Sequence, residues 1–115
     1  MSATQHLQSL VAQDWHAATH HPFTNALADG TLSRDKMAGY LQQDYQFIEG
    51  FVRLLASAVA HAPTLADAVP GAQFLGLVCG PENTYFLRSL HALDVPPTAP
   101  TAPETIAFQK LMDQA

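Results

Sequence analysis

Residues 33–63 constrain the fold more than any other part of the chain. They contain no proline before Pro63, and their only glycines are Gly39 and Gly50. Ser33 is a residue type that begins helices and Pro63 is one that ends them, so one long helix is expected between them. The apolar residues recur close to the 3.6-residue helical period: Met37, Tyr40, Leu41, Tyr45, Phe47, Ile48, Phe51, Val52, Leu55, Ala56 and Val59. The pattern predicts a long amphipathic helix.

Asp44 interrupts the apolar part of this helix. Tyr40, Phe47 and Ile48 flank it at helical spacing. A carboxylate near a buried aromatic face costs free energy unless it has a partner. Asp44 is therefore the first candidate for chemistry, and the simpler alternative is a surface acid paired with a Lys or Arg.

Apolar periodicity and turn residues predict helices elsewhere in the chain too. They are expected over about residues 4–19, 23–28, 65–78, 81–93 and 105–115. Pro70-Gly71 is expected to interrupt the third of these, and Gly80-Pro81 to separate it from the fourth. Thr101 and Glu104 have the spacing of a capping box before the last helix. No alternating strand pattern and no internal repeat occurs, so the chain is predicted to be all-α.

Composition narrows the class of protein further. A length of 115 residues fits one domain, residues 1–115. With 48% hydrophobic and 13% charged residues, some apolar surface is expected to meet another chain or a missing segment. The net charge of −5 and the lack of a basic stripe argue against a nucleic-acid partner. The sequence has no membrane-length apolar run and no signal-peptide pattern, so no membrane partner and a cytoplasmic location are expected.

Three motifs, in this order, resemble the opening of the TenA (thiaminase II) family. They are His21-Pro22-Phe23, Ala28-Asp29-Gly30-Thr31-Leu32, and Tyr40-Leu41-Gln42-Gln43-Asp44-Tyr45 followed by Phe47. Residues 82–86 and 103–108 also fit the family pattern. The resemblance runs from about Trp15 to Met112, and each motif alone is less specific than the ordered series.

The resemblance implies an all-α, haem-oxygenase-like helical bundle, commonly a homotetramer, that acts on a small pyrimidine without a cofactor. The implied activity is hydrolytic deamination of an aminopyrimidine breakdown product of thiamine to hydroxymethylpyrimidine, for thiamine salvage; some members cleave thiamine itself. The family unit is about twice as long, with its nucleophilic cysteine and a late catalytic glutamate on helices after the position of Ala115. The chain is thus expected to be a truncated N-terminal half, inactive alone.

The resemblance also suggests roles for four residues. Asp44 matches a pocket aspartate that binds the pyrimidine edge and helps catalysis. Phe47 and Phe108 match aromatic residues of the pocket, although an aromatic at helical spacing is more often part of a core. Glu82 is a further substrate-binding candidate, although the N-terminal dipole of a helix also favours a carboxylate there.

Two other classes of protein stay open. Related members of the fold are metal-dependent oxidases, which would need Glu82 with His21 or Glu49, while His16 and His20 at i, i+4 are a weaker metal pair. Surface histidines are the simpler interpretation, and no metal site is predicted. The second class is a non-catalytic half-bundle that binds a small ligand or a partner chain.

Cys79 is the only cysteine of the chain. A single cysteine rules out an internal disulfide and a CxxC metal site. Cys79 does not match the position of the family's nucleophile. It is either a reactive thiol or, more commonly for a cysteine beside Leu77 and Val78, a buried one.

Overall fold

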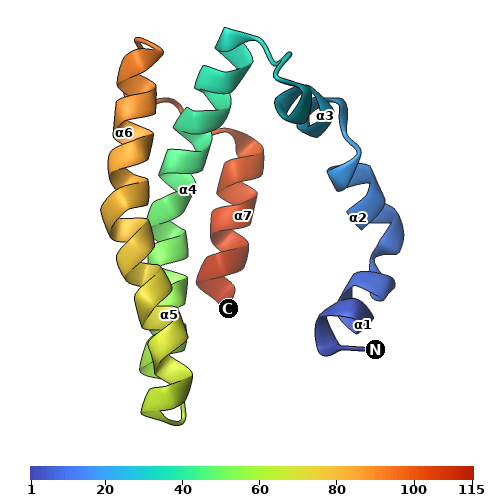
Figure 1. Ribbon diagram of the computed structural model, residues 1–115, viewed down its shortest axis with the longest axis vertical. Coiled ribbons are helices and arrows are strands. Elements are labelled where there is room, and N and C mark those ends of the chain that lie inside the picture. The colour runs from blue at the N-terminus through green and yellow to red at the C-terminus, as the bar shows by residue number, and fades with distance from the viewer. The chain divides into compact units, whose positions relative to one another are not determined.

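The computed structural model describes all residues from Met1 to Ala115, and its regular structure is entirely helical. The chain divides into two compact units, residues 1–33 and 34–115. Figure 1 shows the helices of both units. No helix combines the length and the apolar character that a membrane span requires.

The first unit begins with two short helices, α1 (Ala3–Leu10) and α2 (Ala12–Thr19). The single helix predicted over residues 4–19 is therefore wrong. Val11 lies between the two helices with φ −126° and ψ 32°, outside helical geometry, and its N–H donates to Gln8 O at 3.2 Å. A β-branched residue loses side-chain freedom in a helix, which makes Val11 a favourable place for the break.

Helix α3 (Pro22–Asp29) explains the first two sequence motifs by local structure. The His21 ring caps the helix, because its Nδ1 accepts a hydrogen bond from the Phe23 N–H at 3.0 Å. Pro22 occupies the first helical position, where a missing N–H is harmless. Gly30 ends the helix with φ 72°, a conformation that favours glycine.

The second unit is built around the long helix α4 (Arg34–Ala60), which confirms the prediction made from residues 33–63. Helices α5 (Leu65–Leu77) and α6 (Asn83–Ala92) pack against α4, and so does α7 (Pro103–Gln114). Figure 1 shows α4 between α7 and the α5–α6 pair. Helix α4 therefore contacts each of the other three α-helices of this unit.

Helices α5 and α6 form one continuous rod rather than two separated helices (Figure 1). The predicted interruptions at Pro70-Gly71 and Gly80-Pro81 are wrong. Pro70 lies inside α5, on its exposed side. A proline has no N–H to donate to the carbonyl four residues earlier, but on the exposed side of a helix that carbonyl can bind water instead. The π-helix η1 (Val78–Glu82) joins α5 to α6, and its wider turn makes room for the ring of Pro81.

The buried residues of the second unit lie where its helices meet. They are Ala38, Leu41, Val78, Leu90 and Met112, with Leu90 only 1% exposed. Gly50 lets α7 approach α4 closely, because a Cβ at that position would lie 3.0 Å from the Met112 Cε. Gly71 does the same for α5, where a Cβ would lie 3.0 Å from Val59 Cγ2.

Three glutamines of α4 hold the proline-rich connection between α6 and α7. Their side-chain amides donate to backbone carbonyls: Gln42 to Pro96 at 2.8 Å, Gln43 to Pro100 at 3.0 Å and Gln46 to Ala99 at 2.8 Å. The connection has few backbone partners of its own, so these bonds fix its path along α4.

The predicted capping box before α7 is also wrong. Ala102 is the N-cap, and Thr101 instead donates to Gln46 Oε1 at 2.5 Å. The backbone amide at the start of the helix has its partner on α4: Gln43 Oε1 accepts from the Ala102 N–H and from the Thr105 hydroxyl, both at 2.9 Å. A tertiary contact thus replaces the local cap.

Candidate active site

A groove of about 340 Å³ lies between α4 and α7. Its lining residues are Tyr40, Gln43, Asp44, Phe47, Glu104, Thr105 and Phe108. The four from α4 are spaced i, i+3, i+4 and i+7, which places them on one face of the helix. The groove therefore brings together three of the four predicted site residues: Asp44, Phe47 and Phe108.

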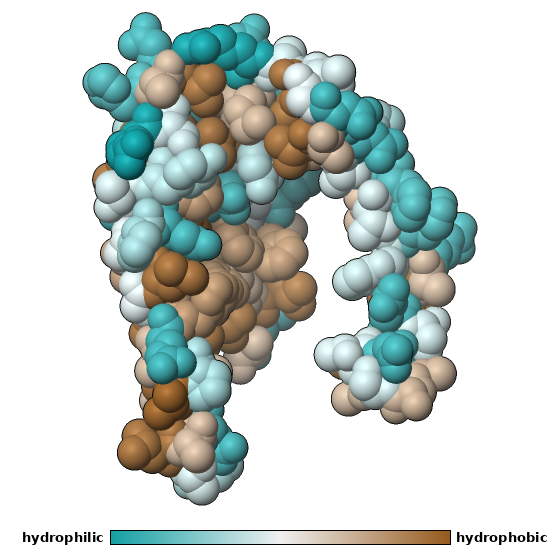
Figure 2. All heavy atoms as spheres, in the orientation of Figure 1, coloured by the Kyte–Doolittle hydropathy of each residue, from teal (hydrophilic) through white to brown (hydrophobic).

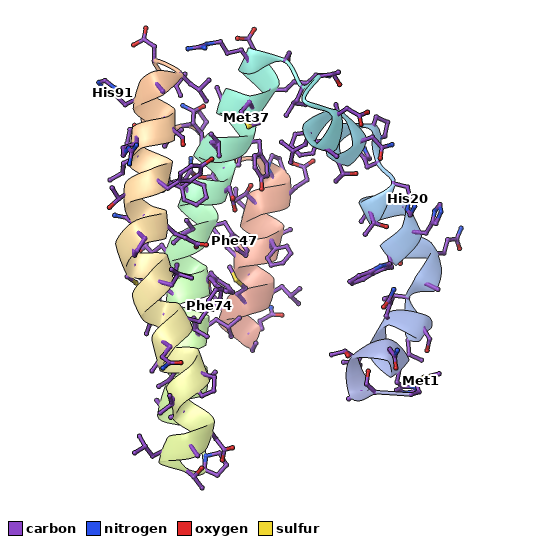
Figure 3. All side chains as sticks on the ribbon, in the orientation of Figure 1. Met1, His20, Met37, Phe47, Phe74 and His91 are labelled. Atoms are coloured by element: carbon purple, nitrogen blue, oxygen red, sulfur yellow. The ribbon has the colours of Figure 1, made fainter.

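Two phenylalanines form the aromatic wall of this groove. The rings of Phe47 and Phe108 are edge to face, with centroids 4.9 Å apart and an interplanar angle of 75°. Figure 3 shows Phe47 on α4, on the side where α7 lies. Phe108 is 52% exposed, so it is not simply a core residue. A flat apolar molecule would find an uncovered ring face there.

The aromatic contacts continue from Phe47 along the same unit. Phe51 is stacked on Phe47 with centroids 5.8 Å apart, and Phe74 of α5 meets Phe51 edge to face at 6.1 Å. Figure 2 shows hydrophobic side chains gathered on this face, and Figure 3 labels Phe47 and Phe74 there. The groove thus lies at one end of an apolar strip that runs from α7 across α4 to α5.

Asp44 is half-buried and its partner is a tyrosine rather than a Lys or Arg. Tyr40, one turn earlier, donates its hydroxyl to the Asp44 carboxylate. Burial raises the pKa of Asp44 above its ordinary value of 3.8, the Tyr40 hydrogen bond lowers it in part, and the negative charge of Glu82 raises it. Asp44 therefore keeps its proton to a higher pH than an exposed aspartate does.

Glu82 does not line the groove. It is exposed at the end of η1, inside the continuous rod, and so it does not lie at a free helix N-terminus. The dipole explanation offered by the sequence is therefore wrong. Glu82 acts on the site through its charge, since it is near enough to raise the pKa of Asp44.

Cys79 lies in a second and larger pocket of about 660 Å³, away from Asp44 and Phe47. The lining residues of this pocket are Tyr45, Gln46, Ile48, Glu49, Val52, Val78, Cys79, Asn83, Pro97, Thr98 and Ala99. The expectation of a buried thiol is wrong, because Cys79 is exposed while its neighbour Val78 takes the inward position, 2% exposed.

Tyr45 faces this second pocket, as its position on the helix predicts. Its hydroxyl donates to Asn83 Oδ1 at 3.2 Å, and its ring lies 6.0 Å from that of Phe86. Tyr45 therefore has a packing role between α4 and α6, and it lines a different pocket from Asp44.

The residues considered for metal binding have other contacts. The rings of His16 and His20 are stacked with centroids 4.0 Å apart, His21 caps α3, and Glu49 pairs with Arg53 at 2.8 Å. No three His, Cys, Asp or Glu side chains come together in a way that could hold a metal ion.

The sequence did not single out Tyr40, Gln43 or Glu104 as site residues. Tyr40 and Gln43 are visible in the same motif as Asp44, at i−4 and i−1, and helical spacing places Tyr40 on the face of Asp44. Glu104 lines the same groove as Gln43 only because α7 packs against α4, which the local sequence pattern does not predict.

Comparison with known proteins agrees with this all-helical fold. The sequence profile of the TENA/THI-4/PQQC family matches residues 9–104, so the chain belongs to this family. The expected fold class, an all-α helical bundle of the haem-oxygenase-like type, is thereby confirmed.

Three curated proteins illustrate the similarity. The thiamine biosynthesis protein THI22 of Saccharomyces cerevisiae is 37% identical over 57 residues, which is 50% of this chain and 10% of that protein. The aminopyrimidine aminohydrolase of Helicobacter pylori is 34% identical over 62 residues, 54% of this chain and 29% of that protein. The aminopyrimidine aminohydrolase of Bacillus subtilis is 29% identical over 65 residues, 56% of this chain and 28% of that protein. The matched segments thus span less than a third of each relative.

Proposed function

We propose that this chain supplies the pyrimidine-binding wall of an aminopyrimidine aminohydrolase of thiamine salvage. The observation that carries the proposal is the α4–α7 groove, where a partly buried carboxylate stands beside two edge-to-face phenylalanines. The printed names of two relatives, aminopyrimidine aminohydrolase, fit a site of this kind.

The groove has the chemistry to bind a flat aminopyrimidine. A carboxylate accepts hydrogen bonds only, so ionised Asp44 can take one from an exocyclic amino group or from a protonated ring nitrogen. The rings of Phe47 and Phe108 can cover the faces of the pyrimidine. The volume of about 340 Å³ is at the small end of ligand pockets, which suits a single ring.

The reaction proposed for the complete protein needs a nucleophile. A thiolate adds to a pyrimidine ring whose nitrogen proton is held by Asp44, the C–N bond to the amine breaks with release of ammonia, and water then supplies the hydroxyl and frees the thiol. Cys79 lines the other pocket, so we propose that this thiolate comes from another part of the protein. The same site could receive thiamine itself, through its aminopyrimidine ring.

We propose that both structural units belong to one TenA-like domain, residues 1–115. The family match from residue 9 to 104 crosses the division between the units at Ser33. A homotetrameric assembly stays a prediction from the family resemblance.

Ammonia release and ligand binding, measured side by side on this chain, test the proposal. We expect the chain to bind the aminopyrimidine without releasing ammonia, because the groove contains no thiol. Phe108→Ala should weaken binding about fivefold, as expected for one aromatic contact of about 1 kcal/mol. Leu111→Ala, one turn along α7 and outside the groove, is the matched control.

Two results would contradict the proposal. Ammonia release that disappears in Cys79→Ser would mean that the larger pocket is the catalytic one. Equal binding by wild type and Phe108→Ala would mean that the groove does not hold the ring. Binding without turnover in the complete protein would instead favour the non-catalytic ligand-binding module.

A further inference from the structure

Tyr40 and Asp44 form a pair that the family resemblance did not assign. They lie one turn apart on α4, line the same groove, and share a hydrogen bond in which the tyrosine hydroxyl is the donor. Burial and the nearby Asp44 carboxylate raise the pKa of Tyr40 above its ordinary value of 10.0. The phenol therefore keeps its proton, and remains a donor, at any pH near neutrality.

We propose that Tyr40 is a positioning residue, whose hydroxyl holds the Asp44 side chain in one orientation in the α4–α7 groove for an aminopyrimidine. The inference rests on the proposed function. Tyr40 occupies one part of the carboxylate, and the remaining lone pairs stay available to a ligand, since an ionised carboxylate offers about four acceptor positions.

The charges around Asp44 show why it needs this donor. Glu82 of η1 raises the pKa of Asp44 by repulsion, and Glu104 of α7 lines the same groove. Burial acts in the same direction as Glu82. Tyr40 is the neighbour whose contact opposes them, because its hydrogen bond favours the charged carboxylate. Without the hydroxyl, Asp44 would be protonated over more of the pH range.

The substitution Tyr40→Phe tests the pair, with Tyr45→Phe as the matched control. Tyr45 is on the same helix but lines the other pocket. The substitution Tyr45→Phe also removes one hydroxyl hydrogen bond, the one to Asn83. The first readout is the NMR titration of the Asp44 side-chain carboxyl, which needs no ligand. Tyr40→Phe should raise the pKa of Asp44 above the wild-type value, and Tyr45→Phe should leave it unchanged.

The second readout is the affinity for 4-aminopyrimidine as a function of pH. Tyr40→Phe should move the acid limb of binding to higher pH and weaken binding about threefold to tenfold above that limb, the effect of one lost hydrogen bond. A merely structural role would lower thermal stability without moving the limb.

The two readouts separate the possible failures. An Asp44 pKa that is the same in wild type and Tyr40→Phe, or that moves equally in Tyr45→Phe, would overturn the positioning role. Failure of the wild type to bind 4-aminopyrimidine, with the Asp44 titration still shifted in Tyr40→Phe, would uphold the pair and reject the proposed function.

Discussion

At the scale of single residues, the protonation of Asp44 links the site to stability. Its pKa in the folded protein is raised by burial and by Glu82, so the folded state binds this proton more tightly than the unfolded chain does. The free energy of unfolding is then expected to fall as the pH rises from the ordinary value of 3.8 through the raised folded value. Ionisation of Asp44 is therefore expected to lower the stability of the fold at neutral pH.

The variant Asp44→Asn should remove this pH dependence. Its amide oxygen can still accept the Tyr40 hydrogen bond, and it carries no charge that burial or Glu82 disfavours. We expect the variant to be more stable than wild type at neutral pH, and the difference to disappear below the ordinary pKa of aspartate. Urea unfolding at the two pH values measures this. A variant that is less stable at neutral pH would mean that the carboxylate is net stabilising.

At the scale of elements, the approach of α7 to α4 depends on Gly50. Gly39→Ala, on the same helix with nothing within 4 Å of the new Cβ, should stabilise the protein by about 0.5–1 kcal/mol through helix propensity. Gly50→Ala should gain less or be destabilising, because its Cβ would lie 3.0 Å from the buried Met112. Thermal unfolding of the two variants gives the comparison. Equal gains would show that α7 does not pack closely there.

The position of α7 depends also on Gln43. Gln43→Ala removes the acceptor of the Ala102 N–H and the Thr105 hydroxyl, so we expect a loss of about 1–3 kcal/mol. Gln42→Ala, which breaks one bond to the exposed Pro96 carbonyl, should lose less than about 1 kcal/mol. Denaturant midpoints of the two variants test this. A larger loss of stability in Gln42→Ala than in Gln43→Ala would contradict this prediction. It would mean that Gln42, and not Gln43, is the main anchor.

At the scale of the whole molecule, the sequence predicted what local periodicity controls and missed what tertiary contacts control. The long helix and the shared face of Asp44 and Phe47 follow from the 3.6-residue period. The continuous α5–α6 rod does not, because a π-turn accommodates Pro81 where a proline normally breaks a helix. The cap of α7 was missed because Gln43 supplies it from another helix. The role proposed for Tyr40 depends on the groove between α4 and α7, which the local sequence pattern does not predict.

We expect an aminopyrimidine to bind in the α4–α7 groove and not in the larger pocket beside Cys79. The most direct measurement is an NMR titration of the isotope-labelled chain with 4-aminopyrimidine, following the assigned amide and aromatic signals. We predict saturable shifts at Asp44, Phe47 and Phe108, and we expect these shifts to be lost in Asp44→Asn. Shifts gathered instead at Val52, Cys79 and the other residues of the larger pocket, or no saturable shifts, would contradict this prediction.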